Sequence, residues 1–528
     1  MNENGSTRAI FFASFMTLIA AGVGFAIRGG ILGEWGREFG FTKFELGTIT
    51  GGGLVGFGVV IVLASLITDY VGYKPILIVA FLLHVLSAVI TLAATPVYAA
   101  AGKDATYWCL YIGMFMFAVA NGLCEAVINP LVATIYPKQK THYLNILHAG
   151  WPGGLILGGL TAACFVGGKP FITSLRWEIP MALFLIPTVI YGFIVLKETF
   201  PESEAKAAGV KYSQMFTQFL SPMLILLLFL HACVGYVELG TDSWITNITE
   251  SMLEGQGLML FVYASSIMFV LRFFAGPIVE RINPVGLLFV SACLGASGLY
   301  MIGQSEAAIF VWASVTIYGL GKTFLWPTML GVVGERYPQG GAVVMGAMGG
   351  IGMLSAGLLG GPGIGYKQDY YASQNLDEAS EEAYERYAVP EADKNSFLML
   401  PEIRGLDGQK VGVILDKSEK GPGTELADMV EKVSKSGEPN EKVAALNAWW
   451  QSEGKPNAES DKAQVAAASI YGGRMALKWT AVVPLAMAVG YLLILLYFRS
   501  KGGYKQEVLH GEEPVGEHYT GGVEGPVE

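Results

Sequence analysis

Residues 107–133 read YWCLYIGMFMFAVANGLCEAVINPLVA, and Glu125 is the only charged side chain in this run. A helix needs about 20 predominantly apolar residues to cross the hydrocarbon core of a bilayer, so the run is long enough to span one. An acidic side chain at that depth costs about 2.5–3.5 kcal/mol or more, and it usually faces a partner or a wet cavity. The stretch therefore predicts a membrane-spanning helix that carries a functional carboxylate.

Runs of this kind recur along the whole chain. Twelve of them cover residues 9–31, 45–68, 75–95, 107–133, 143–166, 178–197, 221–245, 257–280, 284–303, 308–334, 341–363 and 477–498. Their interiors are rich in Gly and Ala, small residues that let helices approach closely in lipid. We therefore expect an all-α membrane protein with twelve transmembrane helices.

The composition fits a polytopic membrane protein. Of the 528 residues, 52% are hydrophobic and only 15% are charged, too few for the surface of a soluble protein of this size. The net charge of −10 argues against nucleic acid as a partner, because phosphate binding needs a basic face. The five cysteines lie in apolar runs without the spacing of a metal or redox site. No cofactor or metal is expected.

The negative charge belongs to two polar segments. Residues 366–475 hold 13 basic and 20 acidic side chains, and residues 499–528 hold 3 and 6. The remainder of the chain is balanced, so the acidity says nothing about the membrane helices. Helix-like stretches within 366–475, such as Asp377–Tyr387, predict either a small helical cap over the outer mouth or a solvated insertion without a role in the chemistry.

The distribution of Lys and Arg predicts the orientation. With the N-terminus inside, the inside segments hold twelve basic residues and the short outside loops hold six. Both termini are therefore expected to be cytoplasmic. The expected organisation is an N-terminal six-helix bundle (1–197), a cytoplasmic linker (198–220), C-terminal helices seven to eleven (221–365), an extracytoplasmic insert (366–475), helix twelve (476–498) and a cytoplasmic acidic tail (499–528).

The chain also repeats itself after about 200 residues, which is six spans. In the second copy of the opening stretch, Lys322 takes the place of Glu125, and Trp326-Pro327 takes the place of Asn129-Pro130. Spans one and seven match more loosely, and Arg28 aligns there with Glu238. Each of spans one, four, seven and ten therefore carries one of these four charges at depth.

Two repeated six-span halves resemble the major facilitator superfamily. The junction 65–74 is similar to the G-x-x-x-D-x-x-G-x-K/R loop of that family, with Asp69, Gly72 and Lys74 matching and Ser65 replacing the first Gly. Within the family, the chain looks most like the fucose-permease-like group of sugar:proton symporters. The residues that carry this likeness are Gly122, Glu125, Asn129-Pro130, Asn145, His148, Gly235, Glu238 and Trp326-Pro327.

The resemblance implies two pseudo-symmetric bundles and alternating access. It further implies proton-coupled import of a small polar solute, a sugar or sugar derivative, by a monomer in a bacterial cytoplasmic (inner) membrane. A nucleoside or an organic anion is the alternative solute, and Arg28 could bind the latter. The alternative functions are those of a transporter-like membrane sensor and of a membrane-embedded enzyme. The sequence offers no signalling domain and no clustered catalytic groups for them.

The candidate site residues fall into three groups. Glu125 and Glu238 are expected to couple protons, because the resemblance places a protonatable glutamate on span four. The expected solute ligands are Arg28, Asn121, Asn129, Asn145, His148, Trp151, Trp244, Lys322 and Trp326. Gating is expected from Asp69, Gly72, Lys74, Glu280 and Arg281, with Asp69 either pairing with Arg281 or capping a neighbouring helix. Arg272 either faces the cavity or pairs with Glu280.

Overall fold

The structure is a computed structural model that describes residues 3–507 and 509, apart from 42, 52, 167–169, 254, 417, 419 and 437–439. Most of the predicted acidic tail, residues 508 and 510–528, lies outside the described residues. The described chain is helical, and its only β-pairing consists of two isolated bridges within the insert. This agrees with the all-α prediction.

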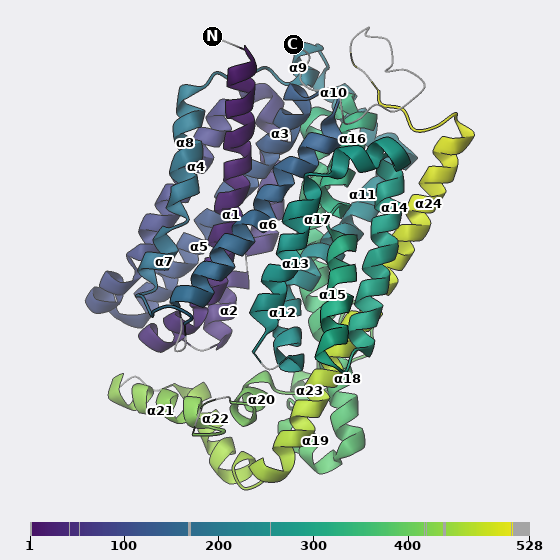
Figure 1. Ribbon diagram of the computed structural model, residues 1–528. Helices are drawn as coiled ribbons and strands as arrows, with labels where there is room; N and C mark the ends of the chain where they lie inside the picture. Colours follow the sequence, from purple (N-terminus) through teal and green to yellow (C-terminus); the bar gives the residue numbers. More distant parts are fainter. Residues whose placement is uncertain are drawn as a thin grey trace.

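The first half of the bundle is built from helical passes that run alternately up and down, with α2 and α3 in one pass and α7 and α8 in another (Figure 1). They are α1 (Glu3–Phe39), α2 (Lys43–Gly51), α3 (Gly53–Val71), α4 (Tyr73–Leu92), α5 (Ala94–Ile135), α6 (Lys140–Phe165), α7 (Glu178–Ala182) and α8 (Leu185–Lys197). The linker to the second half holds α9 (Glu204–Ala207), α10 (Tyr212–Thr217) and η1 (Gln218–Leu220).

The second half uses shorter pieces. Its helices are α11 (Pro222–Gly235), η2 (Tyr236–Gly240), α12 (Thr241–Met252), α13 (Gly257–Arg272), α14 (Ala275–Gln304), α15 (Ala308–Lys322), α16 (Leu325–Arg336), η3 (Pro338–Gly340), α17 (Gly341–Ser355), η4 (Ala356–Gly360) and α18 (Gly361–Ala379). The segments η2 and η4 are π-helical turns that pack against each other where Gly240 meets Gly360.

Ten helical segments among the described residues are long and apolar enough to cross a membrane. Each of them overlaps one of the predicted runs, which accounts for ten of the twelve. The other two runs are helical as well: 143–166 lies in α6, and 257–280 begins in the shorter apolar helix α13. The eighth run is not continuous, because α13 ends at Arg272 and α14 begins at Ala275. A second break follows at Asn283, whose φ of 54° is left-handed.

The two halves meet along two long seams. On one, α17 packs on α3, where Gly346 faces Ser65 and Gly350 approaches the carbonyl of Gly58. On the other, α6 packs on α13 and α16. Because glycine lets backbones come close, these seams bring helices from both halves around one central space.

The insert forms a helical body at the end of the bundle opposite to the linker (Figure 1). It comprises α19 (Glu381–Tyr387), η5 (Glu391–Asp393), α20 (Gly408–Ile414), α21 (Thr424–Ser436), α22 (Glu441–Trp449), η6 (Trp450–Gly454) and α23 (Ala458–Thr480), and α24 (Val482–Ser500) then returns along the bundle. The helices α18 and α23 pack side by side and connect it to the second half. A separate apolar core includes Tyr387, Trp449 and Trp450.

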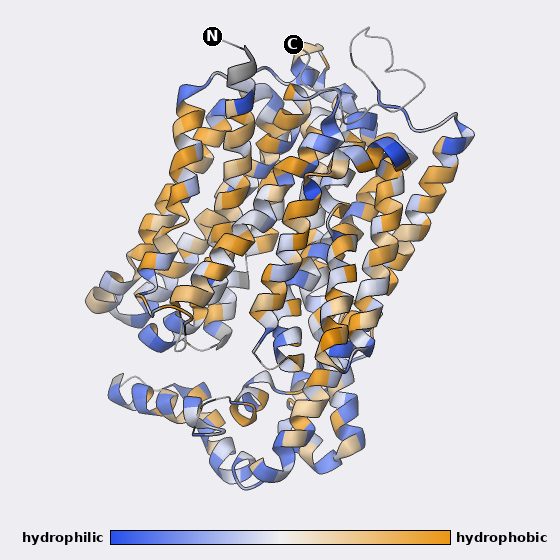
Figure 2. Cartoon of the chain, viewed as in Figure 1, coloured by the Kyte–Doolittle hydropathy of each residue, from blue (hydrophilic) through white to orange (hydrophobic). Residues whose placement is uncertain are grey.

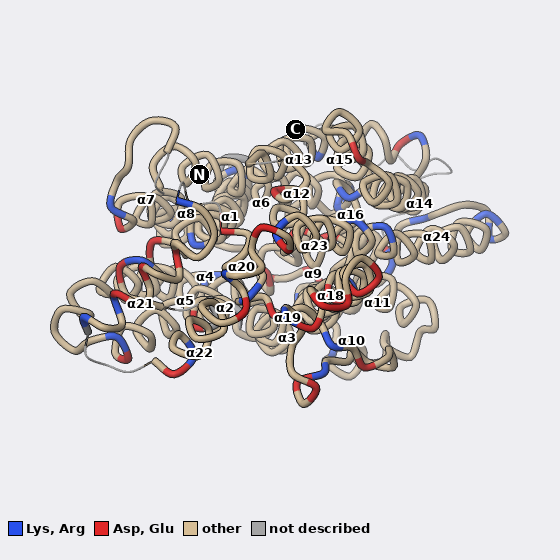
Figure 3. The backbone as a smooth tube through the Cα atoms, turned by 90° about the horizontal axis from the view of Figure 1, so that it is seen from below, with Lys and Arg blue, Asp and Glu red and all other residues tan. Residues whose placement is uncertain are grey.

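The helical bundle and the insert differ in hydropathy and charge. Apolar residues cover the sides of the bundle, whereas hydrophilic residues gather at its ends and on the insert (Figure 2). Seen from the insert side, charged residues concentrate on the insert and on the helix ends (Figure 3). The helix α1 begins, and α24 ends, at the same end of the bundle, as an even number of crossings requires.

Candidate functional site

A cavity with an empty volume of about 460 Å³ lies between the two halves. The cavity is lined by Thr17, Leu18 and Ala21 of α1, Phe57 of α3, Asn121, Cys124 and Glu125 of α5, His148 and Trp151 of α6, Glu238 and Leu239 of η2, Arg272 of α13, Trp326 of α16 and Met353 of α17. Spans one, four, seven and ten all contribute, and six of the predicted site residues are among the lining side chains.

Glu125 enters the cavity from the first half. Its side chain is buried, and its Oε2 accepts a hydrogen bond from Asn129 Nδ2 at 2.7 Å. Asn129 Nδ2 also donates to the backbone carbonyl of Glu125 at 3.0 Å, one helical turn back. The other end of the amide, Oδ1, lies 2.9 Å from His148 Nε2. The carboxylate is thus held by a neutral amide.

Arg272 reaches the cavity from the second half and makes three hydrogen bonds. It is fully buried, and its Nη2 lies 3.0 Å from Glu238 Oε1 in an ion pair. Its Nη1 donates to the backbone carbonyl of His148 at 2.6 Å, and its Nε donates to that of Thr323 at 2.8 Å. The second oxygen of Glu238 has no hydrogen-bond partner within the described protein.

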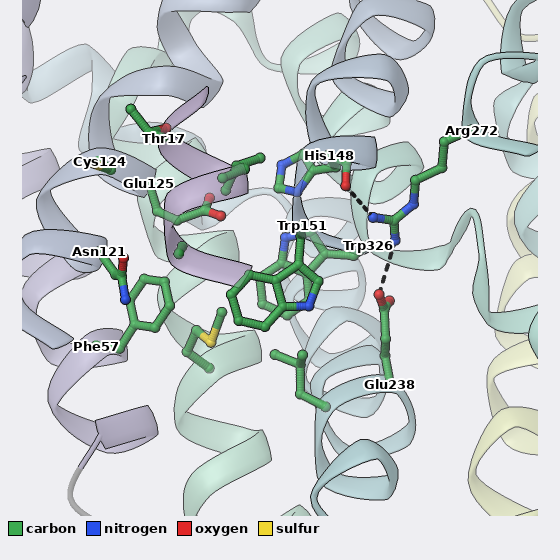
Figure 4. A pocket seen from close by; sticks show the side chains of 14 residues that line it. Thr17, Phe57, Asn121, Cys124, Glu125, His148, Trp151, Glu238, Arg272 and Trp326 are labelled. Carbon is green, nitrogen blue, oxygen red and sulfur yellow. Dashed lines mark hydrogen bonds and ion pairs between the residues drawn. The ribbon is translucent and has the colours of Figure 1, made fainter. Parts of the chain in front are cut away.

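Two tryptophans stand between these polar groups. In the view of Figure 4, the rings of Trp151 and Trp326 lie between Glu125 on one side and the Arg272–Glu238 pair on the other. Trp326 also packs against His231, with 4.6 Å between ring centroids. The site therefore combines the flat faces of two aromatic rings with two carboxylates.

Asn121 lines the cavity but is held from behind. Its Oδ1 lies 2.9 Å from His84 Nε2, and the other nitrogen of His84 lies 2.7 Å from the hydroxyl of Tyr191. Asn145 lies deeper in the seam, where its Nδ2 donates to the Thr141 carbonyl at 2.8 Å and to the Thr328 hydroxyl at 3.1 Å. Asn145 and Asn129 are not among the residues that line the cavity.

The structure places the other predicted cations away from the cavity lining. Arg28 is buried between the rings of Phe117 and Phe184, 3.8 Å and 4.9 Å from their centroids, and it donates to Ser87 at 3.0 Å. Lys322 forms an ion pair with Asp242 on α12. The geometry brings neither cation to Glu125.

Trp244 also lies outside the cavity lining. Its indole N–H donates to the carbonyl of Gly361 at 2.8 Å, so it joins α12 to α18.

The predicted gating loop lies at the linker end of the bundle. Asp69 Oδ2 accepts from the backbone N–H of Ala342 at 2.9 Å, which caps α17 of the other half. Of the two expected roles of Asp69, capping is therefore the one observed. Gly72 precedes α4 with a φ of 90°, a conformation that favours glycine. Lys74 Nζ donates to the carbonyls of Leu196 and Glu198, at 3.0 Å and 2.8 Å, at the end of α8.

Further polar bonds join the halves at this end. Lys140 Nζ donates to the Gly334 carbonyl at 3.1 Å, and the hydroxyl of Thr141 donates to Glu335 at 2.6 Å. Among the residues that the structure describes, Glu280 and Arg281 form no ion pair or side-chain hydrogen bond. The contacts that join the halves here come instead from α3, α6, α16 and α17.

Sequence reasoning left some lining residues undecided or unnamed. Two roles were open for Arg272 because the sequence does not show how deep in the membrane it lies. In the structure, the break after α13 fixes that depth. Thr17, Phe57 and Met353 carry no sequence signal of their own, since each is an ordinary residue in an apolar run. Asp242 follows Glu238 by four residues, and that helical spacing was an available signal for a second acid on the same face.

Comparisons with known proteins come from sequence and from structure. The family profile described as Major Facilitator Superfamily matches residues 10–361. No curated protein matches the chain in sequence. The structure is similar to that of the E. coli fucose:proton symporter, with a TM-score of 0.54 and 15% identity over 69% of this chain and 92% of that chain.

Two further structures have the same architecture. The proton:xylose symporter XylE gives a TM-score of 0.57 with 13% identity over 72% of this chain and 90% of that one. A bacterial homologue of the human lysosomal transporter Spinster, in an inward-facing conformation, gives a TM-score of 0.58 with 12% identity over 93% of this chain and 96% of that one. At these identities the likeness establishes the fold.

Proposed function

Since the chain belongs to the major facilitator superfamily, whose members are transporters rather than enzymes, we propose that it imports a small neutral polar solute together with protons. The observation that carries this proposal is the central cavity, in which two tryptophan rings and two carboxylates from opposite halves surround one space. Solved sugar:proton symporters share its fold.

The charges of the cavity favour a neutral solute over an organic anion. Two acidic side chains line it, and Arg272 already donates to Glu238 and to two backbone carbonyls. Arg28 and Lys322 are engaged elsewhere. An anion would therefore meet carboxylates without a free cation, whereas hydroxyl groups can donate to Glu125 and to the unpartnered oxygen of Glu238.

Proton coupling is assigned to Glu125. It is buried, and within the described residues its carboxylate has no ion-pair partner within 4 Å. A buried carboxylate without a salt bridge can take up a proton at moderate cost, whereas one in a tight ion pair is held ionised. Glu238, which pairs with Arg272, is the second and weaker coupling group.

The contacts between the halves suggest which state the structure represents. Asp69 accepts a hydrogen bond from the backbone N–H of Ala342, and Lys140 and Thr141 donate hydrogen bonds to the other half; these contacts close the linker end. In the proposed orientation this end is cytoplasmic, both termini lie there, and the insert is extracytoplasmic. Release of solute to the cytoplasm then requires that these bonds break. A monomer in a bacterial inner membrane completes the proposal.

A thermal-shift screen of the purified protein tests the solute class. Neutral sugars, nucleosides and carboxylates are compared at equal concentration, because a ligand raises the melting temperature by mass action. We expect neutral sugars to raise it and carboxylates to leave it unchanged. Stabilisation by nucleosides alone would identify the tryptophan walls as a base-stacking site, and stabilisation by carboxylates alone would refute the neutral-solute assignment.

Uptake into proteoliposomes tests the coupling. The solute found in the screen is offered with and without an inward pH gradient, to the wild-type protein and to Glu125→Gln. We expect the gradient to drive accumulation by the wild type only. If Glu125→Gln still accumulates solute along the pH gradient, Glu125 is not the coupling residue. If the wild type only equilibrates the solute without accumulating it, the protein is not an active transporter.

A further inference from the structure

A continuous series of hydrogen bonds leads from Glu125 toward the boundary between the halves. Glu125 Oε2 accepts from Asn129 Nδ2 at 2.7 Å, and Asn129 Oδ1 lies 2.9 Å from His148 Nε2. All three side chains are nine-tenths or more buried. Asn129 joins α5 to α6, and among the described residues its side chain bonds to these two side chains and to the backbone carbonyl of Glu125.

The donors and acceptors in this series are fixed by the amide. Since Nδ2 of Asn129 donates to the carboxylate and to a backbone carbonyl, its Oδ1 is the atom that faces His148. An amide oxygen only accepts, so His148 must carry a proton on Nε2. The carboxylate and the backbone carbonyl of Glu125 together orient the amide, and the amide holds the imidazole.

The next bonds cross from one half to the other. The backbone carbonyl of His148 accepts from Arg272 Nη1 at 2.6 Å, and Arg272 Nη2 pairs with Glu238 at 3.0 Å. Arg272 thus bonds the cavity wall of the second half to α6 of the first half at the depth of the cavity. Figure 4 shows both bonds beside the cavity.

The surroundings of Glu125 contain few other charges. The titratable and charged groups that face it across the cavity are His148 from α6, Arg272 from α13 and Glu238 from η2, with Cys124 beside it on α5. The helices α1, α3, α16 and α17 contribute only groups without charge, such as Thr17, Phe57, Trp326 and Met353. A change in the charge of Glu125 therefore acts first on Asn129, its direct partner.

We propose that Asn129 and His148 are positioning residues that pass the protonation state of Glu125 to Arg272, which latches the two halves at the depth of the cavity. This inference rests on the proposed coupling role of Glu125. It reassigns Asn129 and His148 from solute ligands to coupling residues.

The step needs no proton to travel along the series. Glu125 takes a proton from the side to which the cavity is open, and the proton stays on the carboxyl group. The hydrogen bond from Asn129 then loses its charge assistance, and charge-assisted bonds are roughly twice as strong as neutral ones. The amide and the imidazole become free to shift, α6 loosens at His148, and the carbonyl separates from Arg272. Protonation thereby favours opening at the linker end.

Distance measurements between the halves test this without a solute. Nitroxide labels at Lys138 on the first half and Gln339 on the second, both exposed at the linker end, report the opening by pulsed electron resonance. The native cysteines are replaced by alanine in this background. For the otherwise unchanged protein we expect the ratio of open to closed populations to rise about fivefold or more between pH 8 and pH 5.5, as a coupling of ordinary size gives.

Substitutions within and outside this series of hydrogen bonds distinguish its role from that of other contacts between the halves. Asn129→Leu and His148→Leu should lose the pH response, and Glu125→Gln should be as open at pH 8 as the wild type is at pH 5.5. His148→Gln keeps an N–H donor for Asn129 and should restore the response. His142→Gln is the matched control, because His142 also bonds across the halves, to Gly276, but lies outside the series. It should keep the response.

The proposal is overturned if Asn129→Leu and His148→Leu, folded as judged by size exclusion, keep the wild-type pH response. It is also overturned if His142→Gln loses the response as fully as they do, since any contact between the halves would then suffice. Failure of the proposed function looks different: proteoliposome uptake by Glu125→Gln would still follow the pH gradient, whatever the distances show.

Discussion

At the residue scale, the four buried charges differ in the groups that surround them. Arg28, Glu125, Glu238 and Lys322 stand out equally in the sequence, yet the structure gives each a different environment. Lys322 is neutralised by Asp242, Arg28 is enclosed by aromatic rings, and only Glu125 and Glu238 face the cavity. A charge in the membrane is thus a reason to look for a partner, and the partner decides its role.

The pair of Lys322 and Asp242 is expected to stabilise the fold and not to bind solute. Removing one member leaves a buried charge alone, which costs about 3–5 kcal/mol. Lys322→Met should therefore lower the melting temperature strongly, and adding Asp242→Leu should recover most of the loss. Thermal unfolding of the single and double variants measures this. A double variant as unstable as the single one would contradict the pairing.

Arg28 is expected to leave solute binding unaffected. Its guanidinium lies on Phe117 and Phe184, and within the described residues no carboxylate lies within 4 Å of it. Arg28→Met should keep the dissociation constant of the solute within about twofold. Glu238→Gln should raise it by about tenfold to a hundredfold, because one lost charge-assisted hydrogen bond is worth roughly 1.5–3 kcal/mol. Calorimetric titration compares them, and a tenfold loss in Arg28→Met would restore Arg28 as a solute ligand.

The sequence could locate these charges but not their contacts. Periodicity and length place Glu125 and Lys322 at the same depth of two repeated spans. Which residues lie beside them depends on how the spans pack, and a single chain carries no signal for that. Arg272 illustrates the point, because its depth follows from the break after α13 at Phe273 and Phe274.

At the element scale, the seam between α3 and α17 shows how one residue can replace another in a motif. The loop signature of the family begins with a glycine, where this chain has Ser65. The structure places Gly346 of α17 opposite Ser65, so the space that the first glycine would leave is provided by the facing helix. The sequence predicted the motif from Asp69, Gly72 and Lys74, but the partner of Ser65 lies almost 300 residues away.

This seam predicts a specific steric effect. A side-chain carbon at Gly346 would overlap with Ser65, so Gly346→Ala should lower the melting temperature and slow transport. The double variant Ser65→Gly with Gly346→Ala exchanges the two sizes and should recover both properties. Gly56→Ala is the control, because nothing lies within 4 Å of that position. Equal effects of Gly346→Ala and Gly56→Ala would exclude the steric explanation.

At the scale of the whole molecule, the insert behaves as a body with its own core. Asp416 shows how its loops are held. Its Oδ1 accepts from the N–H of Ser418 at 2.9 Å, and its Oδ2 accepts from the N–H of Glu425 at 2.8 Å. Burial alone would raise the pKa of Asp416, but hydrogen bonds from Ser418 and from backbone N–H groups outweigh it and hold the pKa below its ordinary value.

The stability of the insert should therefore depend on acid. Since the folded pKa of Asp416 lies below the unfolded one, its contribution is present above the unfolded pKa, about 3.9, and is lost as the pH falls through the folded value. Asp416→Asn should lower the stability of the insert near neutrality and weaken its further loss in acid. Limited proteolysis of the 381–457 region between pH 7 and pH 3 measures both, and an unchanged acid profile would exclude Asp416 as a cause.

The attachment of the insert has one more consequence. It grows from α18 and α23 of the second half, with Arg386 bound to Asp461 at 2.8 Å near this base, while its far helix α21 reaches the first half, where Lys432 bonds to the carbonyl of Arg37. The insert is therefore attached to the second half and also contacts the first half. Because the insert contacts both halves, we expect α21 to shift against the first half when the halves move, so a fluorophore on that helix would report this movement from outside the cavity.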